Sequence, residues 1–402
     1  MNILLLTYFF KPDFSAGSFR MQALLDSLIK QDFVNEIYII TTMPNRYSNN
    51  EASNVKQYEE KIVNNKTIRI FRSTSLIHNN RLYIQIFSFI LFSIKSIYIS
   101  IKLRRKINFI FATSSRFGTA MIGFLISKLI RKKVNIDIRD IFSDSLNVLS
   151  NKGYFIRVLS YLFRKIERFV FKRVDSISYV SKGFKEDLSI LNSNQKLFFS
   201  PNGIDKVFIE FFNKNKHQKL NKKSPFNITY AGNIGYGQGL HLIVPQIAKH
   251  FKGKINFTII GNGNAINILN DKISLYQTNN IQMKKPINRS ELIEYYHNAD
   301  ILFLHLGKED AFKKVLPSKI FEYAVFDKPI LAGVSGNARQ FMDKEIPNSF
   351  VFEPGNLEEA EIKINQIIND ISYTRRKDFI EKYDREKLMN NLCLFIKNNA
   401  KI

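Results

Sequence analysis

The sequence predicts an α/β protein built from two parallel-sheet domains. The chain has 402 residues, which exceeds the usual range of a single domain and favours two domains of about 200 residues each. Residues 1–42 run as an apolar strand, a turn-rich loop, a helix-periodic segment and a second apolar strand, which is typical of a doubly wound parallel sheet. The same pattern begins again at residue 226. Two starts of one pattern indicate two domains of the same architecture.

The first domain continues with strands at 67–72, 109–112, 134–138 and 176–181 and with helices at 82–101, 120–130 and 154–174. Arg139 and Asp140 directly follow one of these strands. Ligands of such sheets bind at the carboxyl ends of the strands, so both residues are candidates for ligand contact. An internal ion pair that caps the next helix is the alternative.

The second domain is expected to have strands at 226–231, 255–260, 281–287, 299–305 and 330–332, followed by helices at 357–371 and 385–397. Residues 232–239 contain four glycines after the first of these strands, a composition that lets backbone amides approach a diphosphate. The spacing G-x-G-x-x-G is absent, which disfavours dinucleotide-dependent dehydrogenases. The polar, basic stretch at 213–224 is expected to be a surface loop near the domain boundary.

A second anion-binding pattern lies at 308–333. Pro317 suits the first turn of a helix, because that turn needs no amide hydrogen there. Ser318 and Lys319 follow, and Glu322 lies one turn inside the helix. Helix N-terminal amides with a cation favour phosphate, and a carboxylate accepts hydrogen bonds from vicinal hydroxyls. The segment therefore predicts a nucleotide site.

Composition limits the partners. The formal charge is +25, from 60 Lys and Arg against 35 Asp and Glu, which suits anionic lipid, phosphorylated ligands or nucleic acid. Zinc-finger spacing and aromatic RNA-binding signatures are absent, so no nucleic-acid partner is expected. The single cysteine, Cys393, excludes an internal disulfide framework and suits a reducing compartment. Residues 1–10 lack the basic region of a secretory signal and are expected to form the first strand.

Two helical segments bear on membrane contact. Residues 82–101 form the most apolar stretch, and three interpretations stay open: a buried crossover helix, a helix on the membrane face, and a membrane span. The uncharged run, 82–94, is shorter than the about 20 residues that a span needs, and the strand at 109–112 follows at once. The amphipathic, basic helix at 154–174 either lies on an anionic membrane or packs on the core with a solvated basic face.

Several of these segments resemble, in the same order, family 4 retaining glycosyltransferases of the GT-B fold. They are P-S-K-x-x-E-Y-x-x-x-x-K-P-I at 317–330, P-N-G-I-D at 201–205, G-x-G at 261–263 and R-D at 139–140. The resemblance implies two Rossmann-like parallel-sheet domains with a cleft between them. Residues 1–205 would bind the acceptor and residues 206–385 the nucleotide sugar, and the helix at 386–402 would pack back on the first domain.

The resemblance also assigns site residues. The residues expected at the donor diphosphate are Gly17, Gly232, Asn233, Gly235, Gln238, Ser318 and Lys319, and those expected at the ribose and base are Glu322, Gly261, Gly263 and Ile287. Lys319, Arg139 and Asp140 are the candidate catalytic residues. The family's first motif glutamate falls on Lys314, which cannot accept a hydrogen bond, so Glu309 and Asp310 are the candidates for contact with the donor sugar.

The implied reaction is transfer of a sugar from a UDP-sugar to a lipid-linked glycan, with retention, in cell-surface polysaccharide (O-antigen or capsule) biosynthesis. The donor expected from the subgroup is an amino sugar such as UDP-N-acetyl-fucosamine, and the expected location is the inner face of the cell membrane, held peripherally. No cofactor or metal is expected, because no carboxylate pair has metal spacing. The alternatives are a non-hydrolysing UDP-sugar epimerase and a catalytically silent subunit that binds glycan or membrane.

Overall fold

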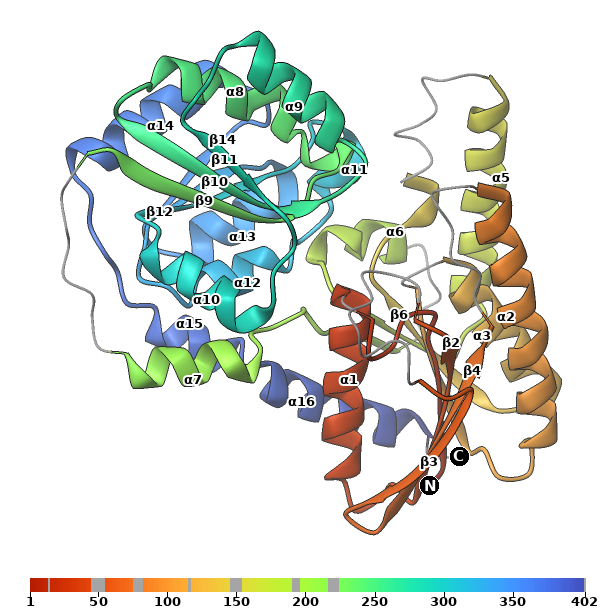
Figure 1. Cartoon of the computed structure of the whole chain (residues 1–402). Coiled ribbons are helices and arrows are strands. Elements are labelled where there is room, and N and C mark those ends of the chain that lie inside the picture. Colours follow the sequence, from red (N-terminus) through yellow and green to blue (C-terminus); the bar gives the residue numbers. More distant parts are fainter. Residues whose placement is uncertain are drawn as a thin grey trace. The chain divides into compact units, whose positions relative to one another are not determined.

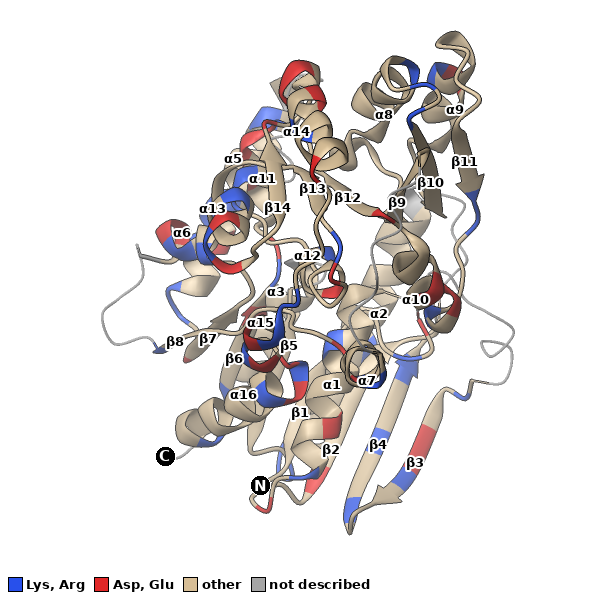
Figure 2. Cartoon of the chain, turned by 90° about the vertical axis from the view of Figure 1, so that its left-hand side faces the viewer, with Lys and Arg blue, Asp and Glu red and all other residues tan. Residues whose placement is uncertain are grey.

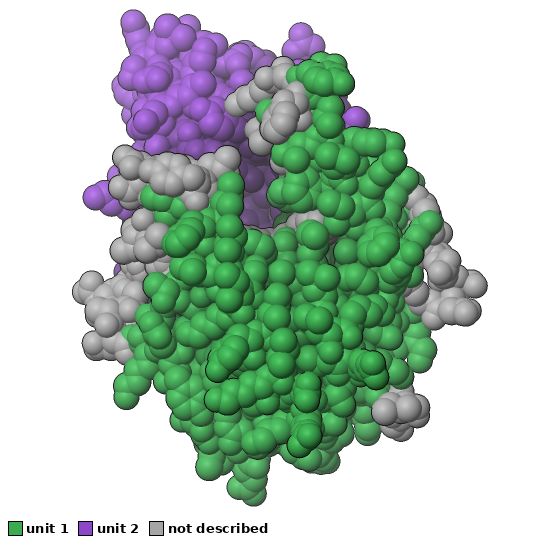
Figure 3. Space-filling model, turned by 90° about the vertical axis from the view of Figure 1, so that its right-hand side faces the viewer, with its two compact units in different colours: residues 1–202, 385–402 green, residues 203–384 purple. Residues whose placement is uncertain are grey.

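The computed structural model describes residues 1–13, 15–44, 55–74, 82–114, 117–144, 154–189, 196–215 and 224–400. The chain divides into two compact units (Figures 1 and 3): unit 1 comprises 1–202 and 385–402, and unit 2 comprises 203–384. The expected domain limits, at 205 and 385, lie next to these divisions. Most of the expected surface loop at 213–224 lies outside the described residues.

Unit 1 contains an eight-stranded sheet in the order β3-β4-β2-β1-β5-β6-β7-β8. All neighbouring strands are parallel except β3 and β4. The strands are β1 (Ile3–Leu6), β2 (Glu36–Thr42), β3 (Tyr58–Val63), β4 (Lys66–Ser73), β5 (Phe109–Thr113), β6 (Lys133–Ile138), β7 (Ser176–Tyr179) and β8 (Lys196–Phe199). The two edge strands, β3 and β8, were not predicted, because both are short and largely exposed or half-exposed.

Helices cover both faces of this sheet (Figure 1). Alternate side chains of β1 divide between two cores, with Ile3 and Leu5 facing α1 (Ala16–Ile29) and α16 (Arg385–Ala400). Leu4 and Leu6 belong to the core shared with α2 (Leu82–Lys102), α3 (Phe117–Ile130) and α5 (Tyr154–Phe171). Because both faces are covered, the strands read as continuous apolar runs in the sequence. Short helices, α6 (Lys185–Ser189) and the 3₁₀ turn η3 (Lys182–Phe184), follow β7.

Unit 2 contains a six-stranded parallel sheet in the order β11-β10-β9-β12-β13-β14. Its strands are β9 (Phe226–Asn233), β10 (Ile255–Asn262), β11 (Ile281–Lys284), β12 (Ile301–His305), β13 (Ile330–Gly333) and β14 (Ser349–Phe352). Its helices are α7 (Lys206–Lys214), α8 (Leu240–His250), α9 (Ile266–Leu275), α10 (Arg289–Asn298), α11 (Asp310–Lys313), α12 (Lys319–Tyr323), α13 (Gly336–Glu345), α14 (Leu357–Asn369) and α15 (Lys377–Lys382). The helices α8, α9 and α14 share one core with the sheet. The helices α10, α12 and α13 lie against the opposite face (Figure 1).

The helix α2 is half buried. One side packs into the core of unit 1 through Ser88, Phe92 and Ser96, and Lys95 Nζ donates to the Arg72 carbonyl of β4 at 2.6 Å. The other side exposes apolar residues. In the described chain, Ile84–Lys102 is the one helical stretch long and apolar enough to cross a membrane. Its packing against β4 makes it a crossover helix with an exposed apolar stripe. Contact of this stripe with a membrane stays a prediction.

Candidate functional site

The glycine loop after β9 is closed by side chains that the sequence had assigned to the diphosphate. Asn233 Nδ2 donates to Gln238 Oε1 at 2.7 Å, and the Gly235 amide donates to the same oxygen at 3.2 Å. A 3₁₀ turn, η4 (Tyr236–Gln238), completes the loop before α8 begins. The structure thus brings Asn233, Gly235 and Gln238 together, and the Gln238 side chain holds the loop closed by accepting both hydrogen bonds.

Lys319 and Glu322 form the charged centre of unit 2. Lys319 Nζ donates to Glu322 Oε2 at 2.7 Å and to the Tyr296 hydroxyl at 3.2 Å. Burial lowers the pKa of Lys319, but Glu322, with smaller contributions from Tyr323 and Tyr230, raises this pKa above its ordinary value. Lys319 is therefore a cation at neutral pH. A Cβ placed on Gly232 would lie 3.8 Å from Lys319 Cε, so the cation lies beside the glycine loop.

Ser318 precedes this short helix without capping it by its side chain. The expected helix start at Pro317 is displaced to Lys319, although Ile320 N donates to the Pro317 carbonyl at 3.2 Å. The segment is therefore a single helical turn that carries Lys319 and Glu322 on one side.

Three buried tyrosines support this centre, and the sequence analysis gave none of them a role, although Tyr323 belongs to the motif at 317–330. The Tyr323 hydroxyl accepts from the Ala231 amide at 3.2 Å, and the Tyr230 hydroxyl donates to the Asn233 carbonyl at 2.6 Å. Burial raises the pKa of Tyr296 and of Tyr323 well above the ordinary value, so both hydroxyls stay neutral. Polar rings in otherwise apolar segments were the signal available in the sequence.

His305 links the glycine loop to the loop that follows β14 and was also missed. Its Nδ1 donates to the Gln238 carbonyl at 2.7 Å, and its Nε2 accepts from the Gly355 amide at 3.1 Å. This pair of bonds selects the neutral tautomer with hydrogen on Nδ1. Burial lowers the pKa of His305 to about 4. Gly239, at φ +60°, lies against the imidazole ring.

Gly261 and Gly263 permit close contact between neighbouring strand ends. Gly261 has φ +153°, and a Cβ there would lie 1.9 Å from the Gly232 carbonyl oxygen. A Cβ on Gly263 would lie 2.3 Å from the Ile234 carbonyl oxygen. These contacts give both glycines a packing role beside the loop. Their expected contact with ribose and base stays a prediction, as does that of Ile287, which lies half buried between β11 and α10.

Replacing Gly261 by alanine is expected to destabilise unit 2 by about 1–3 kcal/mol, because an overpacked methyl group must displace backbone. Urea unfolding followed by circular dichroism measures the change. Gly253→Ala is a matched control, since it also has positive φ (+81°) but nothing within 4 Å of the added Cβ. Equal losses in the two variants would contradict the close approach at Gly232.

The two acidic residues expected near the donor sugar differ in their surroundings. Asp310 begins α11 with its side chain 90% exposed and pairs with Lys313 Nζ at 2.8 Å. The Glu309 carboxylate instead lies over Gly307, whose amide donates to the Gly237 carbonyl at 2.7 Å. Glu309 is therefore the acidic residue that lies nearer the glycine loop, and its contact with a sugar stays a prediction.

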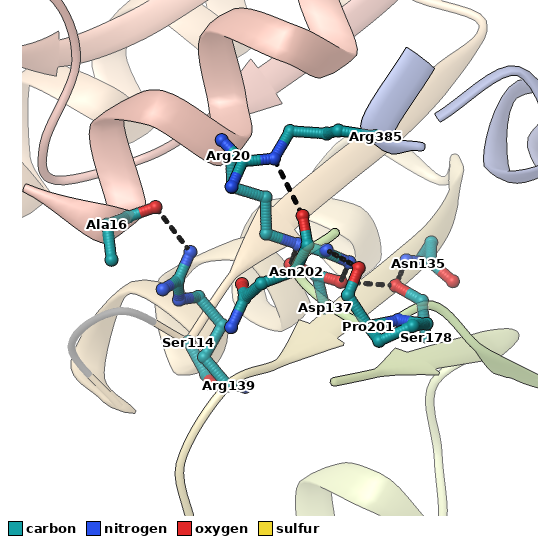
Figure 4. Close-up of polar contacts among 10 residues, drawn as sticks. All are labelled: Ala16, Arg20, Ser114, Asn135, Asp137, Arg139, Ser178, Pro201, Asn202 and Arg385. Carbon is teal, nitrogen blue, oxygen red and sulfur yellow. Dashed lines mark hydrogen bonds and ion pairs between the residues drawn. The ribbon is translucent and has the colours of Figure 1, made fainter. Parts of the chain in front are cut away.

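In unit 1, Arg139 is held at the start of α1 (Figure 4). Its Nη1 donates to the Ala16 carbonyl at 3.1 Å, and its amide donates to Ser114 Oγ at 2.9 Å. Gly17 lies in the first turn of α1, not in the preceding loop as expected, while Asp140 is exposed. Phe14, in the expected loop, lies outside the described residues. Arg139 and Gly17 are thus neighbours in unit 1, and a contact of Gly17 with a diphosphate held by unit 2 stays a prediction.

Close to Arg139 lies a buried ion pair that sequence reasoning missed (Figure 4). Arg20 binds Asp137 with two hydrogen bonds, Nε to Oδ2 at 2.9 Å and Nη2 to Oδ1 at 2.8 Å. Both side chains are almost fully buried. Ser178 Oγ donates to Asp137 Oδ1 at 2.7 Å, and Arg20 Nη1 donates to the Pro201 carbonyl at 3.2 Å. The pair fastens α1 to β6 and orders the strand end that carries Arg139.

The described residues contain no group of three or more His, Cys, Asp or Glu side chains arranged to hold a metal ion. Lys319 is a cation close enough to the glycine loop to contact a phosphate there, and the expected absence of a metal or cofactor stays a prediction.

Comparison of the sequence with known protein families shows what unit 2 is similar to. Residues 212–385 match the family of glycosyl transferases group 1. This segment has the sequence pattern of a group 1 glycosyltransferase domain. The domain contains the glycine loop, His305, Lys319 and Glu322, and it confirms the enzyme class expected from the sequence. No curated protein matches the chain.

Solved structures support the fold of the whole chain. HepE from Anabaena, in complex with UDP-glucose, has a TM-score of 0.66 at 14% identity over 99% of this chain and 100% of its own. Sucrose-phosphate synthase from Thermosynechococcus elongatus has a TM-score of 0.73 at 10% identity over 99% and 98%. The lipopolysaccharide outer core galactosyltransferase WaaB has a TM-score of 0.61 at 12% identity over 98% and 99%. The GT-B fold class, with two Rossmann-like parallel-sheet units, is confirmed.

Proposed function

We propose that this glycosyltransferase moves a sugar from a UDP-sugar to a lipid-linked glycan, with retention of configuration. The observation that carries the proposal is the charged Lys319, paired with Glu322 at 2.7 Å beside the glycine loop of a group 1 domain. A cation next to closely packed backbone amides suits a diphosphate. A carboxylate one turn away suits the hydroxyls of a ribose.

The proposed chemistry depends on stabilising the leaving group. Breaking the bond between sugar and diphosphate leaves negative charge on the diphosphate, which Lys319 and the amides of the glycine loop stabilise because they are already in place. Ligand binding exchanges the Lys319–Glu322 pair for two contacts, Lys319 with phosphate and Glu322 with ribose. Arg139 and Asp140 act on the acceptor side. The reaction proceeds without a metal or cofactor.

Different observations support the proposed donor and the proposed acceptor. UDP is supported by the UDP-glucose bound to HepE and by the name of a similar Burkholderia xenovorans enzyme, a UDP-forming trehalose-phosphate synthase with a TM-score of 0.66 at 10% identity. An amino sugar such as N-acetyl-fucosamine rests on the sequence resemblance. The lipid-linked acceptor draws support from WaaB, which is by its name a lipopolysaccharide outer core galactosyltransferase. A role in O-antigen or capsule synthesis and a peripheral place on the inner face of the membrane rest on the sequence resemblance.

Calorimetric titration with UDP tests the site. Wild type is expected to bind UDP, and Lys319→Ala and Glu322→Ala are each expected to weaken binding about 10–100-fold, the equivalent of one or two charge-assisted hydrogen bonds. Lys313→Ala is the matched control, because it removes an exposed lysine of the same segment. A wild type that does not bind UDP contradicts the proposed donor. Equal affinity in all four proteins contradicts the assigned residues.

A screen of UDP-sugars separates the transferase from its alternatives. A transferase releases UDP only as its sugar reaches an acceptor or water, and proton NMR of the product reports the retained anomer. An epimerase returns an isomeric UDP-sugar, and a silent subunit leaves the donor unchanged. Either of the last two results would overturn the proposed reaction.

A further inference from the structure

The outer surface of three helices of unit 1 is here called the α2-α3-α5 face, and Figure 1 shows these helices on one side of the sheet. All three pack on the same core of the sheet. Gly118 of α3 leaves room for the Phe89 ring of α2, which a Cβ would meet at 2.2 Å. The rings of Phe124 on α3 and Phe169 on α5 lie 6.1 Å apart, edge to face. The helices are therefore fixed to one another as well as to the sheet.

The α2-α3-α5 face is rich in exposed large apolar side chains. On α2, Ile86, Ile90, Ile94 and Tyr98 recur every fourth residue, and they are between 46% and 65% exposed. This spacing places them in one row along the helix. Leu125 and Leu129 extend the apolar surface onto α3, and Tyr161 and Leu162 extend it onto α5. Exposed large apolar residues gathered on three helices that pack on one core favour an interaction site.

The exposed charges of the three helices themselves have one sign, although one of them, Arg164, pairs with Asp144 at 3.0 Å. The sequence contains no acidic residue between Glu60 and Asp137, so α2 and α3 carry none. The acidic residue of α5, Glu167, is buried and accepts the Phe142 amide at 2.8 Å. Every exposed charged side chain on the described residues of the three helices is thus basic: Lys102, Lys128, Arg157, Arg164, Lys165 and Arg168. By contrast, α10, α13 and α15 carry acidic and basic residues side by side (Figure 2).

We propose that the α2-α3-α5 face docks on an anionic lipid bilayer, with its apolar rows entering the interface and its basic residues contacting the headgroups. Apolar burial and cation attraction act together at such a surface, with about 1 kcal/mol from each Lys or Arg near it. A second copy of the chain is disfavoured, because two basic faces repel each other. This inference rests on the proposed function, because docking on the bilayer would bring the enzyme to a lipid-linked acceptor.

The same contacts argue against insertion of α2 across the bilayer. Ser88, Phe92 and Ser96 are fully buried in unit 1, and Lys95 is bound to β4 through the Arg72 carbonyl. A spanning α2 would have to leave these contacts and carry Lys95 into hydrocarbon, where a charge is costly. Docking on the surface keeps the fold intact.

Flotation of the full chain with vesicles tests the proposal. Wild type is expected to float with phosphatidylcholine vesicles that contain phosphatidylglycerol and not with phosphatidylcholine alone. Ile90→Gln/Ile94→Gln and, separately, Lys165→Glu/Arg168→Glu are each expected to reduce the bound fraction at least tenfold. The matched control is Leu242→Gln/Leu275→Gln, which changes two exposed leucines of unit 2. Exposed positions are chosen so that the variants fold, which circular dichroism verifies.

Three outcomes would overturn the proposal. The first is a wild type that does not float with anionic vesicles, and the second is flotation of the α2 and α5 variants equal to that of the control. The third is a wild-type dimer in sedimentation that Ile90→Gln/Ile94→Gln converts to monomer, since this makes the face an interface between copies. UDP titration of the same proteins without vesicles distinguishes a failure of membrane docking from a failure of the proposed transferase function. The surface variants are expected to bind UDP as wild type does.

Discussion

Replacing Asp137 by alanine is expected to destabilise unit 1 by about 3–5 kcal/mol, the cost of leaving one charge of a buried pair without its partner. The Arg20 guanidinium would lose two of its hydrogen bonds and keep only the one to the Pro201 carbonyl. Ser178 would lose its acceptor as well. A loss of this size is a large share of the stability of an ordinary domain.

Urea unfolding, with hydrogen exchange of peptides from β6 read by mass spectrometry, measures this loss in unit 1. Asp26→Ala is the matched control, because Asp26 lies on α1 as Arg20 does but accepts an exposed hydrogen bond from Gln22. Its expected cost is below about 0.5 kcal/mol, as for an ordinary surface position. If both variants lose equally little, the buried pair does not hold α1 to β6.

Lowering the pH from 6.5 to 4 is expected to destabilise unit 2 by up to about 3 kcal/mol through His305 alone. Its folded pKa of about 4 lies below the ordinary value of 6.5. Between these values the unfolded chain binds a proton that the folded chain does not, so stability falls as the pH falls. The proton has no place in the fold, because Nε2 already accepts the Gly355 amide.

Hydrogen exchange of peptides from β12 and the glycine loop, compared across this pH range, measures the effect. His305→Gln keeps a donor and an acceptor but does not titrate, so its pH slope is expected to be smaller by the His305 contribution. His250→Gln is the control, because His250 is half exposed and pairs with Glu361 at the surface. A slope in His305→Gln equal to that of wild type would contradict the role given to His305.

Much of the fold follows from local pattern. Buried parallel strands such as β2 and β5 are continuous apolar runs, and these were located to within a residue. Lys319 and Glu322 were also predicted from local pattern, because they lie three positions apart within one helical turn. β11 ends at Lys284, before the expected residue 287, because Pro286 removes a backbone donor.

The missed features depend on partners distant in sequence. Arg20 and Asp137 are 117 residues apart, and His305 binds Gln238 and Gly355 at separations of 67 and 50 residues. A single sequence shows an Asp in a strand or a His at a strand end, but the residue that satisfies it depends on the order of strands in the sheet. Buried polar residues within apolar strands, such as Asn135 and Asp137, were the visible sign of these networks.

The path of the chain has a consequence for biosynthesis. Unit 1 is discontinuous, because α16 belongs to it although the whole of unit 2 precedes α16 in the sequence. On the ribosome, residues 1–202 emerge long before the helix that covers Leu24, Leu28 and Phe111 through Met389 and Leu392. One face of the nascent sheet stays partly bare until synthesis is almost complete, while unit 2 emerges as an uninterrupted segment. The first domain to be made is therefore the last to be finished.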